Sequence, residues 1–393
     1  MNNNEFKKGI AVGVAATLIV TGTGFAGYQK IMFPKGSALS DTKTVQKLNY
    51  LESLINEEYL EEKEEDSLRE GLYAGLMSGL NDPYSTYYTA EQYKELNTSN
   101  EGSYVGIGAV LQKDKDGGAK IVQLYEGGSG EQAGLKKGDV LKAIDSEDVT
   151  EKETSDIASM IRESDKDSVT LTIQRNEETK EIKVEIRDVE IQTVSHEMLD
   201  DETGYIRISE FSEVTSNQYK KAFEDLQDKG MKKLVVDLRD NPGGLLTAVC
   251  DVLRQILPEG LIVYTEDKNG KKEEEKCDGK SELAMPLAVL VNGGSASASE
   301  IFAGAVKDYG IGTIVGTTTY GKGVVQTIQP LSDGSAVKIT IAKYFTPKGN
   351  DINKKGIAPD VEAELSEDFT DWTELTHEED TQLQAALKEI RQN

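Results

Sequence analysis

The sequence predicts an α/β protein in which a helical region and a small domain of short strands precede a larger α/β domain. Apolar residues recur at helical spacing over residues 42–78. From Gly102 the pattern changes to short strand-like runs. From Val189 strands alternate with helical segments, which is typical of a largely parallel sheet covered by helices. A chain of 393 residues is long enough for two or three such domains.

Residues 1–35 are predicted to be a signal anchor or a signal peptide. Lys7 and Lys8 precede a stretch over 9–25 that has no charge and is almost wholly apolar or small. Its length of about 17–19 residues is at the low end for a spanning helix, and Gly24–Ala26 has the small-x-small pattern of a cleavage site. We expect a retained anchor, with a cleaved signal peptide as the alternative. In both cases the rest of the chain is exported.

Residues 36–100 are predicted to be a helical region. One apolar stripe consists of Val45, Leu48, Leu51, Leu54 and Ile55, and another of Leu68, Leu72 and Leu76. The acid-rich segment 57–70 is interpreted as a solvated face or a surface for a partner helix. Asn81–Tyr84 is predicted to turn the chain before a short helix over 88–96.

Residues 101–188 are predicted to form a small independent domain. Strands are expected over 104–111, 120–124, 140–144, 169–174 and 181–186, with a helix over 154–162. Val105, Gly106, Ile107 and Gly108 open the first strand, and the glycines can turn successive N–H groups inward to hold a peptide carboxylate. The peptide would then lie as an added strand between this strand and the helix. The alternative is a plain glycine turn.

Residues 189–370 are predicted to be the larger α/β domain, and 371–393 a C-terminal helix that begins near Glu374. Strands are expected over 203–209, 233–238, 261–266, 287–291, 314–315, 324–328 and 336–345. Helices are expected over 215–229, 245–257 and 300–308.

Composition narrows the range of functions. The 44 Lys and Arg residues against 70 Asp and Glu give a net charge of −26, so nucleic acid is not an expected partner. Two histidines without zinc-ligand spacing exclude a histidine-based zinc hydrolase, and no metal or other cofactor is expected. Cys250 is predicted to be buried and Cys277, in a charged segment, to be exposed, although export would permit a disulfide.

A serine is presented where the apolar run 287–291 gives way to a helical pattern beginning at Glu300. Helix starts offer free N–H groups that stabilise an anion, so Ser297, at this junction, is the candidate nucleophile among Ser295, Ser297 and Ser299. The alternative is structural, because Ser297 and Glu300 also fit the capping box of a helix start.

Lys322, set between two glycines, is the candidate general base. A desolvated lysine has a lowered pKa and can accept a proton near neutral pH, and a serine with a lysine base is a known variant of the serine triad. Gln326 is a candidate to orient the amine. Residues 316–322 also match the start of a phosphate-binding loop, but a strand-like segment follows where that loop opens a helix. A surface lysine in a turn is the other alternative.

Two backbone N–H groups are candidates for an oxyanion hole. Ala298 follows the candidate nucleophile directly. Gly243 lies in the turn Arg239–Gly244, which follows an apolar strand and exposes N–H groups. The alternative interpretation of this turn is a plain connection between strand and helix.

Several motifs taken together resemble one protease family. The string SGEQAGLKKGDVL (129–141) resembles PDZ domains, especially those of bacterial proteases. With GSASASEI, YGKGVVQ, LRDNPGG, DPYS and TPKGNDINKKGIAPDV it makes the chain from Val45 onward resemble the C-terminal processing peptidases, the tail-specific serine proteases of family S41.

The resemblance implies a crotonase-like ββα protease core with an inserted PDZ domain, a partly open β-barrel, after an N-terminal helical region. By position it implies Ser297 as nucleophile, Lys322 as base, Gln326 as its orienting partner, and Gly243 and Ala298 as the oxyanion hole. Close relatives form ring-like dimers through their terminal regions, with which the acidic helical segment is compatible.

We therefore expect an exported serine endopeptidase, anchored in the membrane or secreted, that captures apolar C-terminal tails of proteins and cleaves peptide bonds. The alternative is a PDZ adaptor that binds such tails without cutting them. The complete set of Ser297, Lys322 and Gln326 argues against the adaptor.

Overall fold

A computed structural model describes residues 39, 41–125, 127–162, 164, 166–365 and 372–392. The expected signal segment, residues 1–35, lies outside these residues. The chain divides into two compact units, Met1–Leu72 and Tyr73–Asn393.

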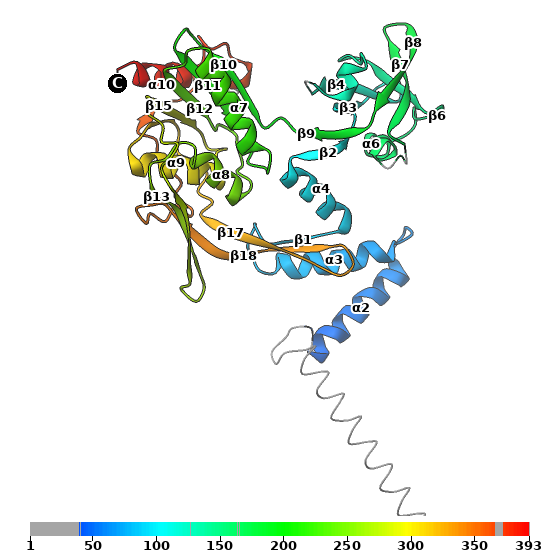
Figure 1. The fold of residues 1–393 in the computed structure, drawn as a ribbon. Helices are drawn as coiled ribbons and strands as arrows, with labels where there is room; N and C mark the ends of the chain where they lie inside the picture. The colour runs from blue at the N-terminus through cyan, green and yellow to red at the C-terminus, as the bar shows by residue number, and fades with distance from the viewer. Residues whose placement is uncertain are drawn as a thin grey trace, which may run out of the picture. The chain divides into compact units, whose positions relative to one another are not determined.

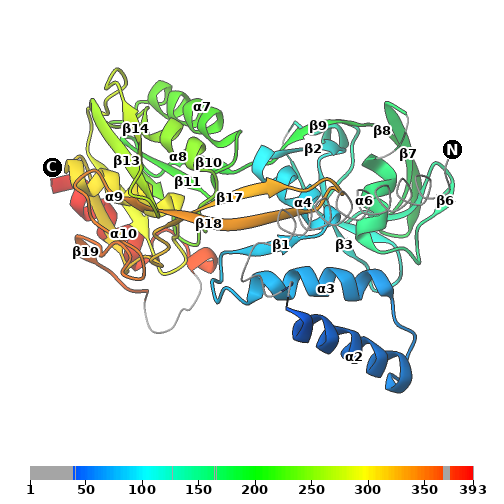
Figure 2. The ribbon, with the colours of Figure 1, turned by 90° about the horizontal axis from the view of Figure 1, so that it is seen from below.

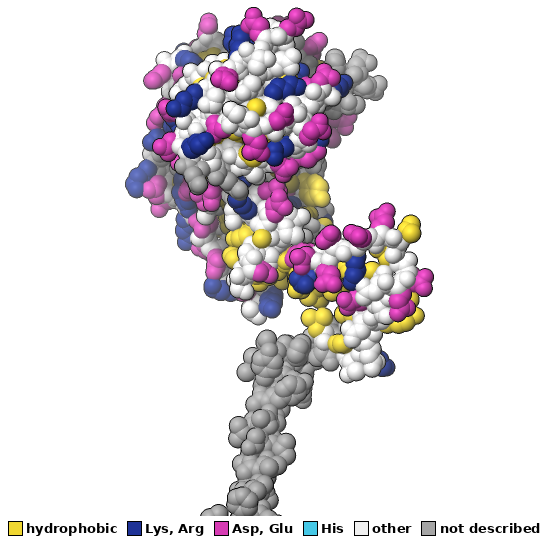
Figure 3. All heavy atoms as spheres, turned by 90° about the vertical axis from the view of Figure 1, so that its right-hand side faces the viewer, with side chains coloured by type: hydrophobic (Ala, Val, Ile, Leu, Met, Phe, Trp, Pro, Cys, Tyr) yellow, Lys and Arg dark blue, Asp and Glu magenta, His cyan; other side chains and the backbone are white. Residues whose placement is uncertain are grey.

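The first unit contains helix α2 (Thr42–Glu58) and most of helix α3 (Glu65–Ser78). The predicted helical stretch is thus two helices, and Asp41 caps the first by accepting from the Lys43 N–H. Neither helix buries a residue. Hydrophobic side chains gather on this surface (Figure 3), and the exposed ones of the unit are Leu39, Val45, Tyr50, Leu51, Leu54, Tyr59, Leu60 and Leu72. Among all the described residues, no helix combines the length and the apolar character needed to cross a membrane.

The second unit opens with strand β1 (Thr86–Tyr88) and helix α4 (Ala90–Glu101). The helix predicted over 88–96 therefore starts and ends later. Thr89 and Gln92 fix its start through a capping box, in which each residue's side chain bonds the other's main-chain N–H. Gly102 ends it in the left-handed conformation.

The small domain is a strand-rich body with its own core. One sheet has the order β3-β4-β5-β7-β8, made of β3 (Ala109–Lys113), β4 (Ala119–Leu124), β5 (Val140–Ile144), β7 (Ser168–Arg175) and β8 (Glu178–Glu185), with β6 (Glu147–Asp148) beside β5. Strand β2 (Ser103–Gly106) pairs instead with β9 (Arg187–Glu190). Helices α5 (Ser129–Gln132) and α6 (Thr154–Arg162) complete it. The strand predicted over 104–111 is therefore two strands, separated at Ile107–Gly108, where Gly108 has a φ of 72°.

The larger domain contains a six-stranded sheet of order β10-β11-β12-β15-β16-β19, of which Figure 1 labels β10, β11, β12 and β15. Its strands are β10 (Val194–Met198), β11 (Thr203–Ile208), β12 (Lys233–Asp237), β15 (Leu287–Val291), β16 (Thr313–Gly316) and β19 (Val361–Glu362), all parallel from β11 onward. Its helices are α7 (Thr215–Asp228), α8 (Leu246–Leu253), α9 (Ala298–Tyr309) and α10 (Thr381–Gln392).

Helices cover both faces of this sheet, which explains why the runs Leu234–Val236 and Leu287–Val291 are apolar at every position. Leu234 and Val236 belong to the core under α7, α8 and α9, whereas Val235, between them, packs with α10. The predicted C-terminal helix is shorter than expected. A 3-10 turn (Trp372–Glu374) precedes it, and Asp380 accepts a hydrogen bond from the Leu383 N–H at its start.

A second sheet has the order β1-β18-β13-β14, with β17 (Val324–Pro330) beside β18 (Ala336–Phe345) in a long hairpin (Figure 2). Strands β13 (Gly260–Asp267) and β14 (Lys272–Cys277) form another hairpin. The expectation that Cys277 is exposed is wrong: β14 brings it opposite Gly260, its side chain is buried, and its thiol donates to the Leu257 carbonyl. Cys250 is buried as predicted, and both thiols are free.

Candidate active site

The turn between β15 and α9 holds Ser297 in a strained conformation. Its φ is 55° and its ψ −112°, and a residue with a side chain adopts such values at a cost of about 1–3 kcal/mol. The strain persists only when the surrounding structure imposes it. Strained strand-to-helix turns expose the nucleophilic serine of α/β hydrolases. Ser297 thus lies at the predicted junction, in a backbone conformation suited to a nucleophile.

The two neighbouring serines serve the scaffold. Ser295 Oγ donates to the Leu238 carbonyl at 2.7 Å, and Ser299 Oγ donates to the Asn241 carbonyl at 3.0 Å. Both side chains are fully buried, whereas Ser297 is half-buried and lines a cavity. Among the three serines, Ser297 is therefore the one that a substrate can reach.

A buried carboxylate connects the turns that carry the two candidate reactive residues. Glu300 Oε2 accepts from the Ser297 N–H at 2.9 Å and from the Lys322 N–H at 2.8 Å. Its Oε1 accepts from Thr319 Oγ1 at 2.6 Å and from the Gly321 N–H at 2.7 Å. The sequence indicated Glu300 only as part of a capping box, so its contacts with the second turn were missed. These bonds hold the main chains of Ser297 and Lys322 against one anionic side chain.

Lys322 lies in a loop that packs closely against residues 353–356. A side chain at Gly321 would place its Cβ 3.0 Å from the Gly356 nitrogen, and one at Gly323 would place its Cβ 2.5 Å from the Asn353 nitrogen. Glycine is therefore required on both sides of Lys322. The strand β17 follows, as expected, where a phosphate-binding loop would open a helix.

The surroundings of the Lys322 ammonium favour its neutral form. Burial lowers its pKa below the ordinary value, and the charge of Lys338 lowers the pKa further. Glu300 and Asp82 act in the opposite direction. The Tyr84 ring lies beside it, with its centre 5.1 Å from Lys322 Nζ. A lysine with a lowered pKa is what base catalysis near neutral pH requires.

The cavity of about 270 Å³ brings the candidates together. Ser297, Ala298, Lys322 and Gln326 all line it. Its remaining wall is mostly apolar, with Leu245, Leu246, Ile301, Val324, Val325, Ile328 and Tyr344 among the lining residues. The Gln326 amide nitrogen donates to the Val324 carbonyl at 3.2 Å and to Thr340 Oγ1 at 3.3 Å. Gln326 thus lines the same cavity as Lys322, and its amide nitrogen donates to the Val324 carbonyl and to the Thr340 hydroxyl.

The turn after β12 approaches the start of α9 closely enough to require glycine. Gly243 has a φ of 105°, and a Cβ there would lie 2.8 Å from Ser297 Cβ and 2.9 Å from the Ala298 nitrogen. The two candidate oxyanion donors are therefore neighbours. The Gly243 N–H donates to Asn241 Oδ1 at 2.8 Å, so it must exchange this partner before it can bind an oxyanion.

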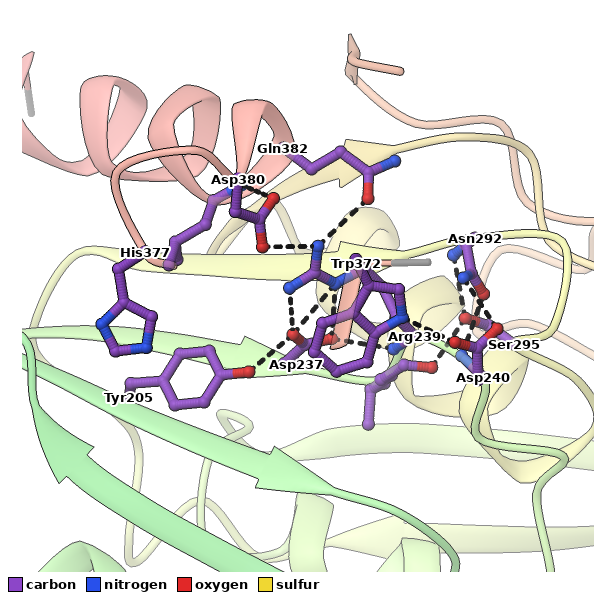
Figure 4. Close-up of polar contacts among 12 residues, drawn as sticks. Tyr205, Asp237, Arg239, Asp240, Asn292, Ser295, Trp372, His377, Asp380 and Gln382 are labelled. Carbon is purple, nitrogen blue, oxygen red and sulfur yellow. Dashed lines mark hydrogen bonds and ion pairs between the residues drawn. The ribbon is translucent and has the colours of Figure 1, made fainter. Parts of the chain in front are cut away.

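A buried ionic cluster anchors the same turn from the side of α10 (Figure 4). The Arg239 guanidinium pairs with Asp237 at 2.6 Å and with Asp380 at 2.8 Å, and all three side chains are almost fully buried. Tyr205 donates to Asp237 at 2.7 Å. Burial, together with this neighbouring carboxylate, raises the pKa of Tyr205, so its hydroxyl stays protonated as a donor.

Trp372 covers the outer side of this cluster. Its ring centre lies 3.9 Å from the Arg239 guanidinium carbon, and its indole N–H donates to Asp240 at 2.6 Å. Asp240 has a φ of 56°. The sequence indicated the turn, but not its anchors, because Trp372 and Asp380 come more than 100 residues later and carry no motif.

The expected carboxylate loop of the small domain lies between β2 and β3. Ile107 is buried, and its carbonyl accepts from the Gly130 N–H at 2.8 Å. The Gly108 carbonyl accepts from the Tyr125 N–H at 2.9 Å. Val105 is exposed, and Gly106 is buried at the end of β2. The loop is thus tied to the chain that leads into α5.

Sequence profiles of three known families match the chain. Residues 202–363 match peptidase family S41, residues 120–175 match a PDZ domain, and residues 22–92 match the N-terminal domain of the activating protease CtpB. The S41 match contains Gly243, Ser297, Ala298, Lys322 and Gln326, whereas the PDZ match begins after the loop 105–108.

Similarity to curated proteins extends over most of the chain. The carboxy-terminal processing protease CtpA of Bacillus subtilis (strain 168) is 36% identical over 356 residues, which cover 90% of this chain and 75% of that protein. The chain belongs to the C-terminal processing proteases of peptidase family S41. This S41 protease is a serine-type peptidase with a PDZ domain.

The chain is also similar to a second curated protein and to a solved structure. A probable CtpA-like serine protease of Staphylococcus aureus (strain N315) is 34% identical over 359 residues, covering 90% of the S41 protease described here and 71% of its relative. The solved structure of the photosystem II D1 C-terminal processing protease is 30% identical, covers 81% of this chain and 86% of its own, and has a TM-score of 0.47.

Proposed function

We propose that this S41 protease is an exported endopeptidase that cuts peptide bonds with Ser297 as nucleophile and Lys322 as general base. The observation that carries the proposal is that a strained serine and a lysine with a lowered pKa line one cavity. Glu300 holds the main chains of both.

In the proposed reaction, neutral Lys322 accepts the Ser297 Oγ proton while Oγ forms a bond to the substrate carbonyl carbon. The N–H groups of Ala298 and Gly243 stabilise the resulting oxyanion, and Gln326 orients the amine. The carbon–nitrogen bond then breaks, and the leaving amine takes the proton from Lys322. Water, deprotonated by Lys322, hydrolyses the acyl-enzyme and regenerates Ser297.

The parts of the chain outside the catalytic site have separate proposed roles. We infer that the loop Val105–Gly108 of the PDZ domain binds the C-terminal carboxylate of protein substrates with apolar tails. The N-terminal segment holds the enzyme at the membrane with its catalytic part outside the cytoplasm. We also propose that the protease core has a crotonase-like arrangement and that the protein forms a homodimer.

The dyad is tested by following cleavage of an unfolded protein with an apolar C-terminus. Purified residues 36–393 are compared with Ser297→Ala and Lys322→Ala, and with Lys343→Ala as a control for loss of an exposed lysine. Cleavage by the control, and folded but inactive dyad variants, would support the proposal. Cleavage by Ser297→Ala would refute the assignment of the nucleophile.

The same experiment separates the protease from the adaptor. An adaptor would bind the tail without turnover, so tail binding and cleavage are measured together. Binding without cleavage, in protein saturated with tail peptide, would favour the adaptor.

A further inference from the structure

Tyr344, near the end of β18, has its hydroxyl between the two candidate reactive residues. The phenol O–H donates to the Lys322 carbonyl at 2.5 Å and to the Ser297 carbonyl at 3.0 Å. The side chain is 1% exposed. A phenol has a single proton, so the two carbonyls share one donor, and the shorter bond goes to Lys322.

This contact complements that of Glu300. The Glu300 carboxylate accepts from the N–H groups of Ser297 and Lys322, and the Tyr344 hydroxyl donates to the carbonyls of the same two residues. The main-chain N–H of each reactive residue is therefore bound by Glu300, and its main-chain carbonyl by Tyr344. The two residues lie 25 positions apart in the sequence, and these buried side chains link them by hydrogen bonds.

Tyr344 also ties the lysine loop to a rigid element. Its main-chain N–H donates to the Gly323 carbonyl at 3.2 Å, and its strand pairs with β13 through Thr265. The residues that carry the amine are thus fastened to the second sheet by one residue, through both its main chain and its side chain.

We propose that the Tyr344 hydroxyl is a positioning group of this protease, which fixes the Lys322 main chain relative to Ser297 so that the amine reaches the serine Oγ. The proposal rests on the dyad proposed above. Burial, with Glu300 and Tyr84 nearby, raises the pKa of Tyr344 well above its ordinary value, so the hydroxyl keeps its proton. The hydroxyl bonds main-chain oxygens, so the substrate is expected to bind normally without it.

The test compares Tyr344→Phe with Tyr309→Phe in the assay described above, which follows cleavage of an unfolded protein with an apolar C-terminus. Tyr309 is a matched control, because its hydroxyl also donates to a main-chain carbonyl, that of Leu261 at 2.9 Å, outside the cavity. Displacement of a reacting group by about 1 Å costs on the order of 100-fold in rate. We expect Tyr344→Phe to lower kcat by about 10- to 100-fold at unchanged KM, and Tyr309→Phe to leave kcat unchanged.

A second pair of variants replaces the hydroxyl by a group of about the same size. Replacing Tyr344 by 4-aminophenylalanine retains a hydrogen-bond donor, whereas 4-methylphenylalanine fills the same space without one. We expect the amino variant to restore most of kcat and the methyl variant not to, even if Tyr344→Phe fails to fold. Equal kcat in this pair, or an equal loss of kcat in Tyr309→Phe, would overturn the positioning role.

Ser297→Ala and Lys322→Ala are measured in the same assay, which separates the two proposals. If either retains activity, the dyad fails and the role of Tyr344 fails with it. If both are inactive while Tyr344→Phe keeps its full kcat, the dyad stands and only the positioning role is wrong.

Discussion

Replacing Glu300 by glutamine keeps the shape of the buried side chain and removes its charge. The amide oxygen can accept from two of the four donors that the carboxylate binds, and the amide NH₂ must face the other two. One orientation directs the NH₂ at the N–H groups of Ser297 and Lys322. The other directs it at Thr319 and Gly321.

The second orientation costs less. The Thr319 hydroxyl already accepts from the Ile357 N–H, and it can rotate to accept from the amide as well, because a hydroxyl oxygen has two lone pairs. The Gly321 N–H then loses its partner, and the Thr319 O–H proton loses the acceptor that the carboxylate supplied. A buried donor without a partner costs about 1–3 kcal/mol, so we expect Glu300→Gln to lower the melting temperature by about 2–10 °C.

The activity should respond to pH in a defined direction. The Glu300 charge raises the pKa of Lys322, and the dyad needs neutral Lys322, so activity rises as pH increases through this pKa. Without that charge the Lys322 pKa falls, and the acid limb of the kcat/KM profile should move to lower pH. Lys338 lowers the same pKa; Lys338→Met should therefore move the acid limb to higher pH.

The assay is initial-rate cleavage of a tail-bearing substrate from mildly acidic to alkaline pH, with melting curves recorded at each pH. Opposite displacements of the acid limb in the two variants would identify Lys322 as the titrating base. A shift to higher pH in Glu300→Gln, or no shift in either variant, would refute the reasoning.

Three further predictions concern the surroundings of the site. Gly243→Ala should lower kcat by about 100-fold or more, because its Cβ would lie 2.8 Å from Ser297 Cβ; steady-state kinetics check this, and wild-type kcat would contradict it. Trp372→Ala should lower the free energy of unfolding by about 1–3 kcal/mol through loss of the Arg239 and Asp240 contacts, measured by urea denaturation; unchanged stability would count against the anchoring role. Gly108→Val should raise KM by about 10-fold at constant kcat. Gly127→Val is the control, because Gly127 has the same φ of 72° but open space around its Cβ, and it should leave KM unchanged. Equal KM values in the two variants would refute the assignment of the carboxylate loop.

Local patterns were sufficient to predict most strands and to place the candidate nucleophile at the start of α9. The runs at Leu234–Val236 and Leu287–Val291 are apolar at every position because helices cover both faces of their sheet, and this pattern is visible in the sequence. Ser297 and Lys322 were chosen as candidates because each has small residues beside it where the chain turns.

Long-range partners could not be predicted in this way. Glu300 has the pattern of a helix cap, and nothing near it in the sequence indicates that it also binds the loop of Lys322. The hydroxyl of Tyr344 and the carboxylate of Asp380 lie in stretches typical of a strand and a helix start. Cys277 was placed on the surface because charged residues surround it in sequence, whereas only the alternation of β14 decides which side chains point inward.

The ionic cluster at Arg239 determines when, during synthesis of the chain, the turn bearing Gly243 gains its full set of supporting contacts. Chains are synthesised from the N-terminus, and their domains fold as units during synthesis. Arg239 leaves the ribosome long before Asp380 and the helix that buries it, so the turn bearing Gly243 initially has only Asp237 as its carboxylate partner. Its second carboxylate arrives only after a further 141 residues have been made. A chain that stops short of Asp380 therefore lacks one of the two carboxylates that hold Arg239, and with it part of the support for the turn bearing Gly243.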